Sequence, residues 1–63
     1  MNTYITNLAF NLKQEAYEIE NLVAGLAVQE QNGEINQDDV EALRMAFASM
    51  QETIEAIKGE YSI

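Results

Sequence analysis

The chain has 63 residues and a mass of 7.1 kDa, which limits it to one small domain, and it contains no cysteine and no histidine. A chain of this length buries only about 60% of the surface that its unfolded form exposes, so its core is thin. The missing cysteines exclude a disulfide, and the missing cysteines and histidines exclude a structural zinc site. We therefore expect no metal or other cofactor and favour oligomerisation.

Three basic residues stand against eleven acidic residues, which gives a formal net charge of −8. Lys13, Arg44 and Lys58 are too few and too scattered to form a face that holds phosphates, so we expect no direct binding to nucleic acid. A basic protein partner fits the charge better, and an acidic surface that only keeps the protein soluble is the alternative. No apolar run approaches the roughly 20 residues that span a bilayer, and no signal peptide is evident. We therefore expect a cytoplasmic protein without membrane contact.

The first element in chain order is a helix over about residues 3–31, with Asn2 or Thr3 as its N-cap. Its apolar residues form one broad stripe, as in a helix that packs on a core, and they are Ile5, Leu8, Ala9, Leu12, Ala16, Ile19, Leu22, Val23 and Leu26. Glu15 lies at the edge of this stripe, and we expect its carboxylate to reach water at the rim. Gly25 interrupts a good helix-forming run at a cost of about 1 kcal/mol relative to alanine.

A turn is expected over residues 32–36. Gly33 can adopt the left-handed conformation that ends a helix, and Asn36 is a good N-cap for the next helix, with Asp39 in the reciprocal position of a capping box. The segment also looks like the second half of a calcium-binding EF-hand loop, but Val28 occupies the position of the first acidic ligand. The turn is therefore the favoured interpretation, and so short a connection folds two long helices back antiparallel.

The second helix is expected over about residues 37–60. Its large apolar residues recur at steps of three and four and form a bulky seam of Val40, Leu43, Phe47, Met50, Ile54, Ile57 and Tyr61. Beside it runs a small row, which permits close helix contact and consists of Ala42, Ala46, Ser49, Thr53 and Ala56. We expect the first helix to cover the bulky seam and only part of this wide face.

These patterns predict an all-α fold, a single domain over 1–63 in which an antiparallel two-helix hairpin dimerises into a four-helix bundle. The predicted oligomer interface consists of Ala42, Ala46, Phe47, Ser49, Met50, Thr53, Ile54 and Ala56. In architecture the hairpin resembles the plasmid copy-number regulators of the Rop family, which are short helical hairpins that dimerise. The RNA-binding face of that family is basic, whereas only Lys13 lies near Phe10 and Tyr17 here, so the resemblance implies the architecture alone.

The candidate binding surface is the far side of the first helix. Phe10 and Tyr17 lie seven residues apart among neutral amides, as in an interface rich in aromatics and poor in charge. The predicted partner-binding residues are Asn7, Phe10, Gln14, Tyr17 and Asn21. Packing of the two aromatics against the second helix or inside the oligomer is the alternative. A less specific acidic surface, able to imitate phosphate, consists of Glu20, Glu41, Glu52 and Glu55.

No pair of residues suits nucleophilic catalysis, because Ser49 has neither a histidine nor another base to activate it. Glu15 and Glu18 are a carboxylate pair, but they lack the histidines of carboxylate metal sites in helical bundles. We therefore expect no catalytic residues and a non-enzymatic protein-binding regulator, an inhibitor or adaptor. Small acidic helical proteins with which phages and mobile elements block basic nucleic-acid-handling host proteins are the analogy. The alternative is a structural self-assembly module without a separate partner surface.

Overall fold

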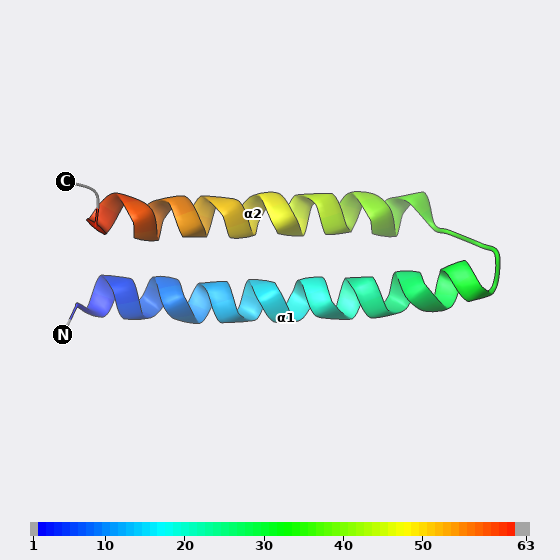
Figure 1. Cartoon of the computed structure of the whole chain (residues 1–63), viewed down its shortest axis with the longest axis horizontal. Helices are drawn as coiled ribbons and strands as arrows, with labels where there is room; N and C mark the ends of the chain where they lie inside the picture. The colour runs from blue at the N-terminus through cyan, green and yellow to red at the C-terminus, as the bar shows by residue number, and fades with distance from the viewer. Residues whose placement is uncertain (1, 62–63) are drawn as a thin grey trace.

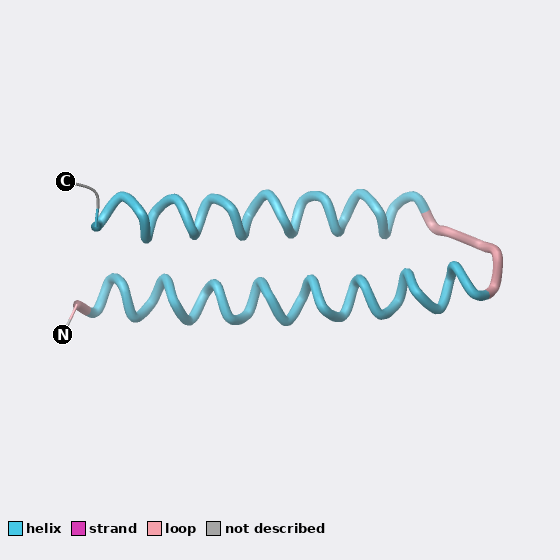
Figure 2. The backbone as a smooth tube through the Cα atoms, viewed as in Figure 1, coloured by secondary structure: helices cyan, strands magenta, loops and turns pink. Residues whose placement is uncertain are grey.

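The computed structural model describes residues 2–61 as two antiparallel α-helices joined by a short turn (Figure 1). Helix α1 spans Thr3–Gln31 and α2 spans Gln37–Tyr61. Within residues 2–61, irregular backbone is confined to Asn2 and the turn at residues 32–36 (Figure 2). The hairpin measures 48 × 18 × 14 Å. The predicted all-α helical hairpin is therefore confirmed. Within residues 2–61, neither helix is long and apolar enough to cross a membrane.

Of the two predicted N-caps of α1, the structure uses Asn2. Its Oδ1 accepts a hydrogen bond from the backbone N–H of Ile5 at 3.3 Å, and its backbone is extended. This bond satisfies one of the four N–H groups that a helix start leaves without a partner. No proline interrupts the chain, and α1 continues through Gly25 without a break for 29 residues.

Helix α1 ends in a Schellman motif around Gly33, whose φ is +74°. The N–H of Gly33 donates to the carbonyl of Glu30 at 3.1 Å, and the N–H of Glu34 donates to the carbonyl of Gln29 at 3.0 Å. These bonds satisfy carbonyls in the last turn of α1, and they require a residue that tolerates a left-handed backbone at position 33.

Gly33→Ala is expected to lower the free energy of unfolding by about 1–2 kcal/mol, because a Cβ is strained at this φ although it meets no atom within 4 Å. Gly25→Ala is the matched control, since Gly25 lies inside a helix and a Cβ added there meets no atom within 4 Å. That change should raise stability by about 0.5–1 kcal/mol. Thermal unfolding followed by circular dichroism measures both, and equal effects at the two glycines would contradict the role of the turn.

The start of α2 differs from the predicted capping box. Asn36 does cap the helix, because its Oδ1 accepts from the N–H of Asp38 at 2.8 Å. The N–H of Asn36, however, donates to Gln29 Oε1 at 2.8 Å, and Gln29 Nε2 donates to Asp39 Oδ2 at 2.6 Å. The amide of Gln29 offers both an acceptor and donors, so it takes the place of the reciprocal bond. This residue therefore ties the last turn of α1 to the first turn of α2.

Helix α1 faces α2 through a narrower seam than the predicted stripe. The half-buried positions keep a strict heptad spacing and are Ile5, Leu8, Leu12, Glu15, Ile19, Leu22, Leu26 and Gln29. Ala9, Ala16 and Val23, which belong to the predicted stripe, are exposed. A single neighbouring helix covers only such a seam, whereas the broad stripe would need a second one.

Helix α2 turns both its small row and part of its bulky seam toward α1, so α1 covers the bulky seam only in part. Ala42, Ala46, Thr53 and Ala56 are half-buried, and Ser49 reaches a side chain of α1 although it is exposed. Large side chains on α1 meet small ones on α2, an alternation that lets two helices approach closely. Of the bulky seam, Leu43, Met50 and Ile57 are half-buried like the small row, whereas Val40, Phe47, Ile54 and Tyr61 are exposed.

The residues predicted for the oligomer interface are thus divided between two environments. Five of them are already half-buried within the chain, namely Ala42, Ala46, Met50, Thr53 and Ala56, while Phe47, Ser49 and Ile54 are exposed. None of the residues 2–61 is fully buried. The hairpin by itself therefore has a contact seam in place of a closed core.

Candidate partner-binding surface

Phe10 and Tyr17 project from the side of α1 that faces away from α2. They lie seven residues apart, so they share one row of the helix, and this row is opposite the seam that begins at Ile5. Phe10 is 62% exposed and Tyr17 is 66% exposed. Such exposure of two rings rules out the alternative that they pack against the small row of α2 within the chain.

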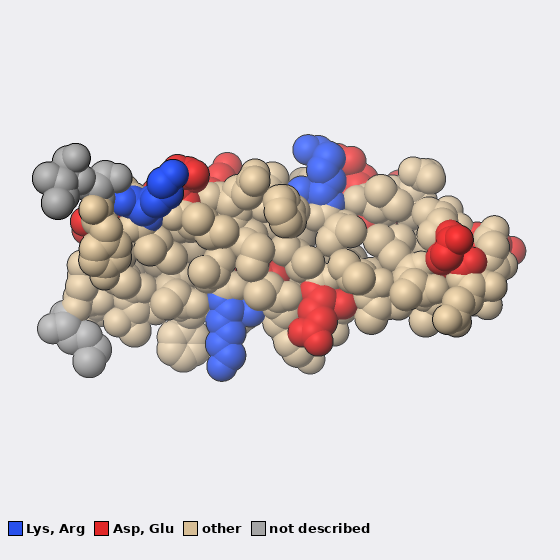
Figure 3. Space-filling model, viewed as in Figure 1, with Lys and Arg blue, Asp and Glu red and all other residues tan. Residues whose placement is uncertain are grey.

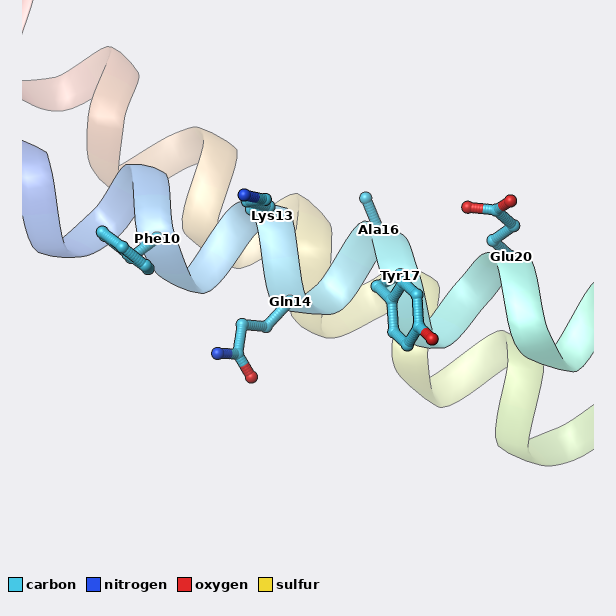
Figure 4. A pocket seen from close by; sticks show the side chains of 6 residues that line it. All are labelled: Phe10, Lys13, Gln14, Ala16, Tyr17 and Glu20. Atoms are coloured by element: carbon cyan, nitrogen blue, oxygen red, sulfur yellow. The ribbon is translucent and has the colours of Figure 1, made fainter.

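The two rings border a hollow of about 520 Å³ on the surface of α1 (Figure 4). Phe10, Gln14 and Tyr17 project on one side of it, and Ala16 and Glu20 project on the other, with α2 passing behind (Figure 4). Lys13 completes the lining. We call this surface the aromatic face. Its rings and the Ala16 methyl offer apolar contact, and an amide, an ammonium and a carboxylate stand around them, which suits one apolar side chain of a protein partner.

The structure brings together three of the five predicted partner-binding residues, Phe10, Gln14 and Tyr17. Asn7 and Asn21 are exposed on the same helix but do not line the hollow. The sequence prediction placed Lys13 near the two rings without including it among the binding residues, and it missed Ala16 and Glu20 as part of this patch. Helical spacing was the available signal, because residues three and four positions from an aromatic side chain share its surface.

Comparisons with family models, curated proteins and solved structures returned no match.

Glu15 lies in the seam between the helices, which corrects the expectation of a solvated carboxylate at the rim. Its Oε2 accepts a hydrogen bond of 2.6 Å from the Ser49 hydroxyl of α2, while Oε1 is buried without a hydrogen-bond partner. The heptad places Glu15 between Leu12 and Ile19, both half-buried, whereas Glu18 is exposed on another row. The two carboxylates thus occupy different environments and do not share a site. Among residues 2–61, no three acidic side chains gather to hold a metal ion.

The predicted acidic residues Glu20, Glu41, Glu52 and Glu55 are all exposed. Two of them form ion pairs with a basic residue three positions further along α2. Arg44 Nε donates to both carboxylate oxygens of Glu41 at 3.0 Å, and Lys58 Nζ lies 3.9 Å from Glu55 Oε1. The hydrogen bonds from Arg44 lower the pKa of the Glu41 carboxyl from its usual value. Because both pairs are solvated, they contribute little to stability and leave the surface strongly acidic.

Proposed function

We propose that this protein is a non-enzymatic regulator, an inhibitor or adaptor, that binds another protein through the aromatic face. The observation that carries the proposal is the pair of exposed rings, Phe10 and Tyr17, that border one hollow. Exposed aromatic residues that surround a pocket are typical centres of binding energy at protein interfaces. The hairpin presents them on a long regular helix, where their spacing is set by the backbone.

The net charge of −8 supports a partner with a basic surface, such as a protein that itself handles nucleic acid. Charge complementarity accelerates association and selects among partners more than it adds affinity. The solvated acids, including Glu52 and Glu55, would steer a basic partner toward the hairpin, and the aromatic face would then supply the close contact. The two contributions are separable by salt, because only the steering is screened.

The test uses three forms of the chain as baits that capture proteins from cells of the native host. Wild type, the Phe10→Ala/Tyr17→Ala double variant and the Val28→Ala control are immobilised, and captured proteins are identified by mass spectrometry. Val28 is an exposed apolar residue of α1 outside the hollow. A protein captured by wild type and the control, but not by the double variant, is then purified, and its affinity is measured.

We expect the double variant to bind the purified partner at least about 30-fold more weakly, since the loss of even one hot-spot residue costs about 2 kcal/mol or more. The affinity of wild type should change little between low and high salt if the aromatic face dominates. Equal capture by all three forms would contradict the proposal. Loss of the oligomer in the double variant would instead support a self-assembly module.

A further inference from the structure

The hairpin exposes more surface than a compact protein of its mass. Its accessible area is 5031 Å², whereas a folded monomer of this mass exposes roughly 4,100 Å². The excess of about 900 Å² is close to the roughly 800 Å² that each partner buries in an interface of standard size. The radius of gyration of 14.8 Å likewise exceeds the roughly 11 Å expected of a compact domain of this length. One missing neighbour of standard size would account for the excess of accessible area.

One row of α2 leaves four large apolar side chains uncovered. We call it the outer row: Val40, Phe47, Ile54 and Tyr61. These residues are seven apart and therefore lie one above the other along the whole helix. Phe47 is 53% exposed and Ile54 is 42% exposed. Leu43, Met50 and Ile57 fill the positions between them and remain only half-buried beside α1. Together they form a heptad seam, which is the pattern that packs against another helix of the same period.

Charge is excluded from this seam. Neither its outer row nor the positions between contain an acidic or basic residue, while Glu41, Glu52 and Glu55 lie on other rows of α2. One broad face of the hairpin likewise carries few charges, which stand mostly along its long edges (Figure 3). A basic partner finds no complement on an uncharged row. Two acidic chains, in contrast, can meet there without opposing their charges at close range.

We infer that the outer row of α2 is the interface through which two copies of this chain pair into a four-helix bundle. This inference concerns a surface separate from the aromatic face and does not depend on the proposed partner. In an antiparallel pairing of α2 with its copy, Met50 lies close to the twofold axis, because it is midway between Val40 and Tyr61 at the ends of the row. Phe10 and Tyr17 stay uncovered, so the dimer presents two aromatic faces.

The experiment uses the two phenylalanines of the chain as a matched pair, since both are more than half exposed. The masses of wild type, Phe47→Glu and Phe10→Glu are measured by sedimentation equilibrium over micromolar concentrations, with circular dichroism to check that each is helical. We expect wild type and Phe10→Glu to be dimers. Phe47→Glu should raise the dimer dissociation constant at least about 100-fold, because a carboxylate is placed in a dry apolar seam.

A cysteine variant gives a readout that does not depend on the folding of Phe47→Glu. The chain has no cysteine of its own, so Met50→Cys and Phe10→Cys can each be treated with a short bismaleimide crosslinker. We expect covalent dimers from Met50→Cys and none from Phe10→Cys. A folded wild-type monomer at micromolar concentration would overturn the inference. So would a dimer that survives Phe47→Glu and is lost in Phe10→Glu, which would place the pairing on the aromatic face.

Discussion

Glu15→Leu is expected to raise the free energy of unfolding by about 1–2 kcal/mol, because it replaces a carboxylate in the seam with an apolar side chain. One oxygen of Glu15 is buried without a hydrogen-bond partner, and removing such a group is favourable. Thermal unfolding at one fixed protein concentration should show a melting temperature about 4–8 °C higher per kcal/mol. Glu18→Leu is the matched control, since Glu18 is exposed and should change stability by no more than about 0.5 kcal/mol.

Ser49→Ala should act in the opposite direction, because the Ser49 hydroxyl is the donor to Glu15 Oε2. Its loss leaves the carboxylate in the seam without that bond and should lower the free energy of unfolding by about 1 kcal/mol. If Glu15→Leu lowered stability and Ser49→Ala left it unchanged, Glu15 would be solvated in solution. The placement of this side chain in the seam would then be wrong.

Ala46→Leu is expected to lower the free energy of unfolding by about 1–3 kcal/mol, because extra methylene groups in the seam push the two helices apart. Ala46 is half-buried in the small row of α2, and α1 is the neighbouring element that covers it. Ala48→Leu is the matched control on the same helix, because Ala48 is exposed and leucine is nearly as good a helix former as alanine. Chemical denaturation of both variants measures the difference.

The opposite result for Ala46→Leu would mean that the small row does not face α1 within one chain. If the variant kept the stability of the hairpin but became monomeric, the small row would be an interface between copies, and the outer row of α2 would be the surface left for α1. Mass measurement of the same samples by light scattering therefore accompanies the denaturation. The substitution thus tests which of the two rows of α2 faces inward within one chain.

The candidate site shows how much of a binding surface the helical period can predict. Phe10 and Tyr17 were predicted as a surface because they fall opposite the leucines of α1, and the structure exposes both. The pattern gave equal support to the alternative that the two rings pack on α2 or are buried in an oligomer. The helical period shows in which direction a side chain points, but it does not show what lies next to it. Only the position of α2 excluded packing within the chain. Lys13 and Glu20 entered the site because the hollow depends on side-chain conformations.

The sequence by itself determined the two helices, the turn between them and their antiparallel course. These features follow from local signals: the heptad spacing, the Asn2 and Asn36 caps, and the left-handed Gly33. Only the tertiary structure decided which apolar row of α2 meets α1, that Gln29 bridges the turn, and that Glu15 lies inside the seam. These are contacts between residues seven or more positions apart or between whole faces. They depend on how large and small side chains fit across the seam, which the period of each helix does not specify.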